Sequence, residues 1–292
     1  MKPQVIIDFM RHGQTMYGHV LAQEMERLGY DPKSLFKDSQ IQPAGDRGER
    51  PSKRIGLEPG RLARYKRIGY EEHKSVRFAQ DNETQRMATE GRLTEVGLEQ
   101  IRRATKILRD MMDPEQEVLM LFASPRARAR ETAKMILEDL AKNGIPVEKA
   151  RTEIKLRDVN THWMTILQRA NELGVRQNPW RWWLEGSDHE ALGRIEGSEA
   201  IRSRISRFVQ VVLRYVRIYR GSPHLSSKGL RVLAITHDVP ILCWINRVLD
   251  IRSFEPGAIV ELKIDQTGTA RLQIVGSDPR EERAIGPVQA FL

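Results

Sequence analysis

The feature that most constrains this 292-residue chain is an alternation of short aliphatic segments with longer amphipathic ones. Short runs of branched and aliphatic residues are typical of buried strands, and apolar residues spaced three and four apart are typical of helices. The expected strands are 4–10, 118–123, 153–156 and 231–236, and the expected helices are 94–111, 125–140, 198–219 and 238–249. This alternation predicts an α/β fold, a three-layer α/β/α sandwich around one mostly parallel sheet.

Three regions lie outside this rhythm. Residues 43–92 are rich in glycine, proline and charge, so we expect an inserted loop or small cap within a single domain that covers 1–275. Segments 259–264 and 270–275 flank the turn sequence DQTGT and predict a hairpin that adds edge strands to the sheet. We expect residues 276–292 to form a loosely packed C-terminal tail.

The composition allows a large buried core and excludes several classes of protein. Hydrophobic residues make up 40% of the chain and charged residues 30%, a balance that excludes a disordered protein. The single cysteine, Cys243, excludes a disulfide framework and a multi-cysteine metal site. We find no signal peptide or membrane span and expect a soluble cytoplasmic protein. The net charge of +9 favours an anionic partner, which leaves small phosphorylated substrates and nucleic acid both open.

Histidines follow two of the expected strands directly. The first strand leads into Arg11-His12-Gly13-Gln14-Thr15, and the fourth ends in Thr236-His237-Asp238. Open α/β sheets bind ligands at the carboxyl ends of their strands. An arginine next to such a histidine favours an anionic ligand, because a guanidinium at a strand end is costly to desolvate alone.

The second strand leads into a helix with three arginines. Arg126 and Arg130 are four residues apart and lie on one side, whereas Arg128 shares the apolar side with Thr132. We therefore expect Arg126 and Arg130 to be surface charges. An arginine on the buried stripe of a first helical turn favours a bound anion, which the helix N-terminus also attracts.

The order RHGQT, LTEVG, SPRARARETA and THD resembles the RHGET, LTxxG, SxLxRAxxTA and SHG elements of the histidine phosphatase superfamily (phosphoglycerate mutase-like, branch 1). The resemblance runs from residue 4 to about residue 250, although the insertion at 43–92 has no counterpart in the compact members. It implies that His12 attacks phosphorus and becomes phosphohistidine, with no cofactor or metal. It also implies a set of phosphoryl-binding residues, of which the last two make minor contacts: Arg11, Arg128, His237, Gln14 and Thr15.

The proton donor to the leaving oxygen is open between two aspartates. The resemblance to branch 1 points to an acid after the third strand, where Asp158 stands in Leu156-Arg157-Asp158. Asp238, directly after His237, resembles instead the proton donor of the acid-phosphatase and phytase branch. We favour Asp158, because RHGQT lacks the further arginine of that other branch.

The leading hypothesis is a phosphatase that hydrolyses a phosphomonoester. A phosphomutase is the first alternative, but mutases typically carry glutamate, tryptophan and asparagine where this chain has Gln14, Tyr17 and Gly18. A basic nucleic-acid- or protein-binding module on a retained fold is the second alternative. It rests on the basic insertion and on arginines opposite the apolar stripe of 198–219, namely Arg204, Arg207, Arg214 and Arg217.

Overall fold

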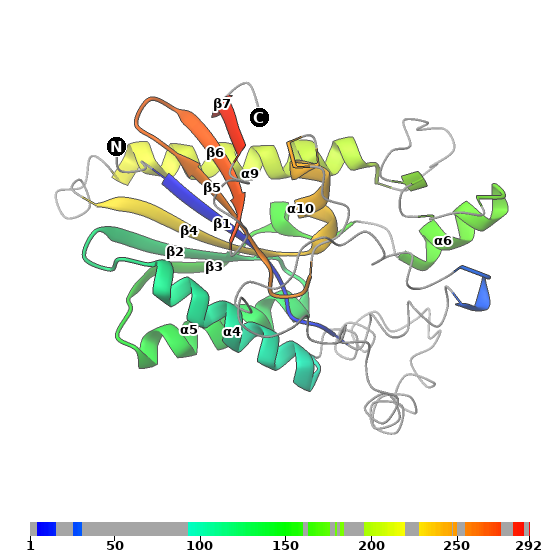
Figure 1. The fold of residues 1–292 in the computed structure, drawn as a ribbon, viewed down its shortest axis with the longest axis horizontal. Coiled ribbons are helices and arrows are strands. Elements are labelled where there is room, and N and C mark those ends of the chain that lie inside the picture. Colours follow the sequence, from blue (N-terminus) through cyan, green and yellow to red (C-terminus); the bar gives the residue numbers. More distant parts are fainter. Residues whose placement is uncertain are drawn as a thin grey trace.

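The computed structural model describes residues 5–15, 26–30, 93–159, 163–175, 179, 182–183, 196–219, 228–246, 248–249, 255–275, 283–288 and 292. Figure 1 shows its elements along the chain. They are β1 (Val5–Arg11), α4 (Glu95–Met111), β2 (Glu117–Ala123), α5 (Ala127–Lys142), β3 (Val147–Thr152), η2 (Ile154–Leu156), α6 (Trp163–Glu172), α9 (Ser198–Tyr219), β4 (Gly229–Thr236), α10 (Asp238–Ile245), β5 (Ile259–Ile264), β6 (Thr269–Ile274) and β7 (Arg283–Pro287).

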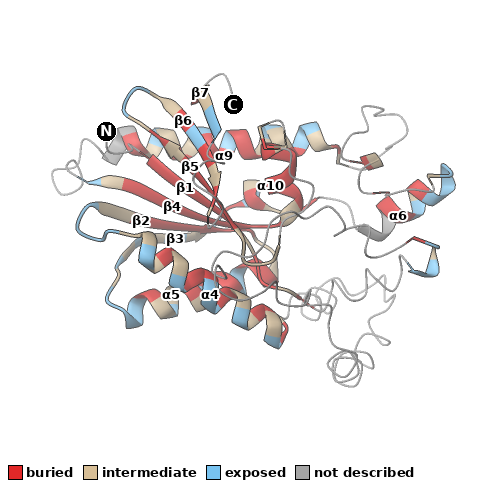
Figure 2. Cartoon of the chain, in the orientation of Figure 1, coloured by how far each residue is buried: buried red, intermediate tan, exposed pale blue. Residues whose placement is uncertain are grey.

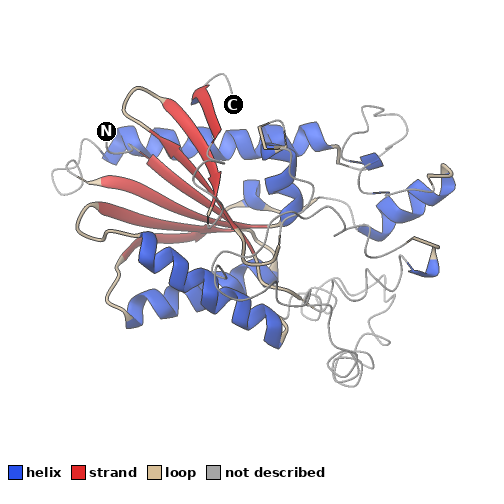
Figure 3. Ribbon diagram, in the orientation of Figure 1, coloured by secondary structure: helices blue, strands red, loops and turns tan. Residues whose placement is uncertain are grey.

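The seven strands form one twisted sheet in the order β3-β2-β4-β1-β5-β6-β7 (Figure 3). Strands β3, β2, β4 and β1 are parallel neighbours. Strands β5, β6 and β7 continue the sheet in antiparallel pairs from the β1 edge. The predicted α/β class is confirmed, and so is the predicted hairpin, which the turn 265–268 closes between β5 and β6.

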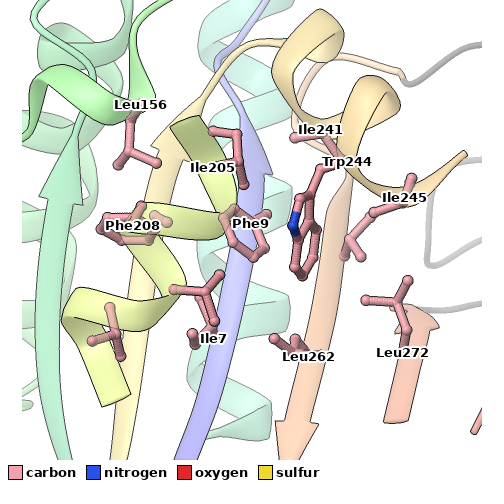
Figure 4. Packing of buried hydrophobic residues seen from close by; sticks show 14 of the residues in the cluster. Ile7, Phe9, Leu156, Ile205, Phe208, Ile241, Trp244, Ile245, Leu262 and Leu272 are labelled. Carbon is pink, nitrogen blue, oxygen red and sulfur yellow. The ribbon is translucent and has the colours of Figure 1, made fainter. Parts of the chain in front are cut away.

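Helices cover both faces of the sheet, which makes the predicted three layers (Figures 1 and 2). On one face, α9 and α10 pack over the side chains of Ile7, Phe9 and Leu262 (Figure 4). On the other face, α4 and α5 bury Ile101 and Ile136 against the strands. Within the described ranges, every helix is too short or too polar to form a transmembrane span.

Most predicted elements are confirmed, but the third strand is wrong. The strand is β3 at Val147–Thr152, and residues 154–156 form the short helix η2 instead. Glu153 redirects the backbone there, because its carboxylate accepts a hydrogen bond from the Lys155 amide and caps η2. A 3₁₀ turn and a short strand cannot be told apart by their apolar residues, because both are too short to show a periodicity.

The predicted end of one helix and the predicted C-terminal tail also differ from the structure. Helix α10 stops at Ile245 rather than Leu249. Residues 283–287 do not pack loosely but pair with β6 as the edge strand β7, and Val288 is buried. The predicted insertion at 43–92 lies outside the described residues, and the domain boundary at 275 stays a prediction.

Buried charge lies on the α4 side of the sheet, away from the strand ends that carry histidine. The Arg231 guanidinium donates to Asp8 at 2.8 Å, to Glu117 at 2.7 Å and to Glu261 at 3.3 Å. Burial raises the pKa of Asp8 to about 7, although the charge of Arg231 opposes this. Among the described residues, the second oxygen of Asp8 has no hydrogen-bond partner, which suits a protonated carboxyl.

Candidate active site

The carboxyl ends of three adjacent parallel strands bring the sequence motifs together. The register pairs Arg11 of β1 with Thr236 of β4, and Ala123 of β2 with Ile235 of β4. The residues that follow therefore emerge at one level of the same sheet edge. The His12 amide donates to the Thr236 carbonyl at 3.1 Å. His12 and His237 end with ring centroids 4.9 Å apart and ring planes inclined at 69°.

The turn after His12 packs directly on the start of α4, which explains why the LTEVG segment belongs to the site. Thr94 caps α4 by accepting from the Gly97 amide, and its own amide donates to the Gln14 carbonyl at 3.0 Å. Two glycines make this approach possible. A side-chain carbon at Gly13 would lie 2.6 Å from the Gly97 carbonyl, and one at Gly97 would lie 2.2 Å from the Gln14 carbonyl.

Helix α5 delivers Arg128 to the centre of the site. Arg128 lies on a buried stripe with Thr132, Ile136 and Leu140, whereas Arg130 is exposed. The helical-phase prediction is thus confirmed for these two arginines. Arg126 is the extended N-cap of α5, so helical phase does not decide the direction of its side chain; it is partly exposed, and its charge helps to lower the pKa of His237.

One ring nitrogen of His12 faces the Arg128 guanidinium, and the other is held by the backbone. Its Nδ1–H donates to the Gly13 carbonyl at 2.7 Å, which leaves the Nε2 lone pair to accept from Arg128 Nε at 2.9 Å. Burial, with the nearby charges of Arg128 and Arg11, holds the pKa of His12 well below its ordinary value. The ring is therefore neutral, and its Nε2 lone pair is unprotonated and accepts from the guanidinium.

His237 shares the same guanidinium. The Arg128 Nε–H also reaches His237 Nδ1 at 3.2 Å, and His237 Nε2 lies 2.8 Å from Ser124 Oγ. Burial and the charges of Arg128 and Arg126 hold the pKa of His237 well below its ordinary value. A neutral ring that accepts at Nδ1 must carry its proton on Nε2, so Nε2–H donates to Ser124.

The two candidate proton donors lie in different surroundings. Asp158 is buried, its Oδ2 pairs with Arg128 Nη2, and the same oxygen is 3.4 Å from His237 Nδ1. Asp238 is more exposed and pairs with Arg11 at 3.1 Å. Asp158 therefore contacts Arg128 and His237, the two groups beside His12. Asp238 contacts Arg11 instead.

Gln14 contacts α4, and Thr15 pairs with the segment just before that helix. The Gln14 amide donates to the Gln100 side chain at 3.0 Å, and Thr15 is buried and forms a single bridge with Leu93. Their predicted minor contacts with phosphate stay predictions. Ser124 stands first in the SPRARARETA segment, and its contact with His237 gives it a place in the site that was not predicted.

Similarity to a known protein family extends over much of the chain. A sequence model of the histidine phosphatase superfamily (branch 1) matches residues 77–284. No curated protein has a significant sequence match to this chain.

Among solved structures, phosphoglycerate mutase from Bacillus anthracis is similar, with a TM-score of 0.51 at 14% identity over 93% of this chain and 92% of that chain. A mycobacterial glucosyl-3-phosphoglycerate phosphatase matches with a TM-score of 0.43 at 14% identity, over 92% of this chain and 96% of that chain. At such low identity the likeness to the mutase concerns the fold alone. The family match, which covers most of the chain, carries the assignment: this protein belongs to the histidine phosphatase superfamily, branch 1.

Proposed function

We propose that this protein is a phosphatase that hydrolyses a small phosphomonoester through a phosphohistidine on His12. One observation carries the proposal. The lone pair of His12 Nε2 meets Arg128 at 2.9 Å, within a buried group that also contains His237 and Asp158. A nucleophile, an anion-binding cation and an acid within contact distance are the components that phosphoryl transfer requires.

His12 supplies the nucleophile in the first step. Its Nε2 attacks phosphorus while the bond from phosphorus to the leaving oxygen breaks, and the product is an N–P bond. The hydrogen bond from Nδ1 to the Gly13 carbonyl fixes the ring orientation and stabilises the positive charge that develops on the ring. Because the pKa of His12 is lowered, the lone pair is available without prior loss of a proton.

The phosphoryl oxygens bind where the arginine and the second histidine converge. Arg128 offers a guanidinium at the centre, and Arg11 offers a second at the rim. His237 caps the N-terminus of α10 without using its side chain for the cap, so its ring stays directed at the site. The guanidinium groups of Arg128 and Arg11 are donors that already point at the developing charge, and such donors lower the barrier without reorganising during the reaction.

Asp158 acts as the acid in the first step and as the base in the second. The incoming phosphoryl group takes the place of the carboxyl at Arg128, and the carboxyl, as the general acid, gives a proton to the leaving oxygen. Water then attacks the phosphohistidine and passes a proton to the Asp158 carboxylate. The N–P bond breaks, inorganic phosphate leaves, and the electron pair returns to His12 Nε2.

Trapping the phosphoenzyme tests this scheme. Brief exposure to a ³²P-labelled phosphomonoester, followed by quenching, should label the protein with phosphate that is acid-labile and base-stable. His12→Ala should abolish both the label and the release of phosphate while far-ultraviolet circular dichroism stays unchanged. Label that persists without His12 would refute the mechanism.

The same experiment separates hydrolysis from phosphoryl return to an acceptor. For this comparison the labelled enzyme is mixed with an unlabelled monophosphate. A phosphatase releases the label to water as inorganic phosphate, whereas a mutase transfers the label to the added monophosphate. The departures of Gln14, Tyr17 and Gly18 from the mutase pattern favour water as the acceptor. The burial of Arg204, whose side chain is 11% exposed, removes one arginine from the basic face on which the binding-module alternative rests.

A further inference from the structure

Asp158 belongs to a short loop whose backbone is held by side chains from other elements. This segment, residues 153–159, follows β3, contains η2 and ends just after Asp158, and we call it the acid loop. Four consecutive carbonyls of the loop, those of residues 155–158, each accept a hydrogen bond from a side chain. Thr236, next to His237, supplies one of them, to the Leu156 carbonyl at 2.7 Å.

Arg204 of α9 supplies the other three. Its Nη1 donates to the Lys155 carbonyl at 2.8 Å and to the Arg157 carbonyl at 2.6 Å. Its Nη2 approaches the Asp158 carbonyl at 3.4 Å. The last carbonyls of a helical turn have no partner within the turn, so Arg204 and Thr236 together complete the hydrogen bonding of the bend.

Glu196 orients this guanidinium from the opposite side. Its two oxygens accept from Arg204 Nε at 3.2 Å and from Nη2 at 3.5 Å, and Arg157 Nη2 approaches the same carboxylate at 3.6 Å. Only a planar fork with several fixed donors can face a carboxylate and three carbonyls at once. A lysine ammonium at position 204 could not span them.

The apolar side of the loop is anchored to the same helix. Leu156 and Ile205, the residue after Arg204, lie in one buried cluster above β1 (Figure 4). The hydrogen bonds of Arg204 and the packing of Leu156 therefore fix the loop on two sides. Neither contact reaches the groups that react.

The backbone of the loop sets the direction of the acid. The Val159 amide donates to Asp158 Oδ1 at 2.8 Å, which turns Oδ2 toward Arg128 and His237. A shift of the peptide at residue 158 would move this oxygen relative to the site. Misplacement of a catalytic group by about 1 Å can reduce the rate by about 100-fold.

We propose that Arg204, oriented by Glu196, is a positioning residue that holds the acid loop so that Asp158 can protonate the leaving group. The proposal rests on the proposed function, since it concerns the acid of that reaction. Loss of this positioning should slow some substrates and not others. A misplaced acid slows esters whose leaving oxygen needs a proton and spares esters whose leaving oxygen does not.

The test compares kcat/KM for an alkyl phosphate and for p-nitrophenyl phosphate in Arg204→Lys and in Glu196→Gln. Each should lose about 10- to 100-fold on the alkyl ester and less than about threefold on the nitrophenyl ester. Arg207→Ala is the matched control, since Arg207 is an exposed arginine on the same helix, and it should change neither rate. Both test variants keep a polar group of similar length, and if one does not fold the other carries the test.

Adding Asp158→Asn separates positioning from general loss of structure. If Arg204 acts through Asp158, the double variant Asp158→Asn/Arg204→Lys should hydrolyse the alkyl ester no more slowly than Asp158→Asn alone. Equal losses on both esters, or a further loss in the double variant, would overturn the positioning role while the phosphatase assignment stands. Asp158→Asn without leaving-group dependence would refute the acid itself, and the positioning role with it.

Discussion

Asp158→Asn is the substitution that most directly tests which group protonates the leaving oxygen. Asparagine keeps the shape of the side chain, and its carbonyl can still accept from the Val159 amide. It removes the proton that the acid would give, together with the negative charge that pairs with Arg128. Phosphate binding should not weaken, because Arg128 then meets the phosphoryl group without a competing carboxylate.

The expected loss in kcat/KM depends on proton transfer, because binding is not weakened by the substitution. General acid catalysis contributes about 10²- to 10⁴-fold when the leaving group needs a proton. An alkyl phosphate should therefore lose about that much in kcat/KM. p-Nitrophenyl phosphate, whose leaving oxygen is a weak base, should lose less than about tenfold. The KM for either ester should stay unchanged or fall.

Asp238→Asn provides the matched comparison. Asp238 pairs with Arg11 at 3.1 Å and is about a third exposed, so its loss should lower both rates by a similar, modest factor. The assay is phosphate release at saturating and limiting concentrations of the two esters for both variants. Leaving-group dependence in Asp238→Asn but not in Asp158→Asn would refute our assignment and place the chemistry with the acid-phosphatase branch.

Three further outcomes are expected. Arg128→Ala should lower kcat by about 10³-fold or more, because its charge acts in the transition state, whereas the exposed Arg130→Ala should leave steady-state rates unchanged. Because the pKa of His12 lies well below its ordinary value, kcat/KM should not fall between pH 7.5 and about 6, where an unperturbed histidine near 6.5 would protonate; a pH–rate profile with half-loss near 6.5 would contradict this. Asp8, with its pKa raised from 3.8 to about 7, binds a proton in the folded state that the unfolded state releases, so stability is fully present below pH 3.8 and falls by about 1.4 kcal/mol per unit until about pH 7. Urea unfolding of Asp8→Asn at several pH values should lack this slope, and equal slopes in both proteins would disprove it.

Much of the fold was predictable because local patterns and tertiary packing agree. Thr94 precedes a periodic apolar run, and it is the cap of α4. The apolar stripe through Ile201 and Phe208 is the buried face of α9. The strands β1, β2 and β4 are buried on both faces, so their aliphatic runs stand out from the surrounding sequence. Their order in the sheet depends on long-range pairing, which the sequence pattern does not contain.

The edges of the sheet were harder to predict for a physical reason. Strand β3 alternates half-buried and exposed residues and includes Lys149 and Arg151. The Lys149 ammonium lies over the ring of Tyr215, and the Arg151 guanidinium lies over the ring of Phe122. Strand β7 is mostly exposed, and its glycine and proline are typical of loops. Charged edge strands protect a sheet from pairing with other chains, and the same charges hide them from a hydrophobicity pattern.

The candidate site divides along similar lines. His12, Arg128 and His237 follow strands or lie on a helical stripe, so strand ends and helical phase were sufficient to bring them together. Arg204 was instead assigned to a solvent-facing row, because helical phase says which side of α9 it occupies but not what lies there. The acid loop crosses that side, and its unpaired carbonyls draw the guanidinium in. Arg204 thus contacts the acid loop, which lies 46 to 49 residues earlier in the chain. The path of that loop is a property of the folded backbone, so no local sequence pattern could have predicted this contact.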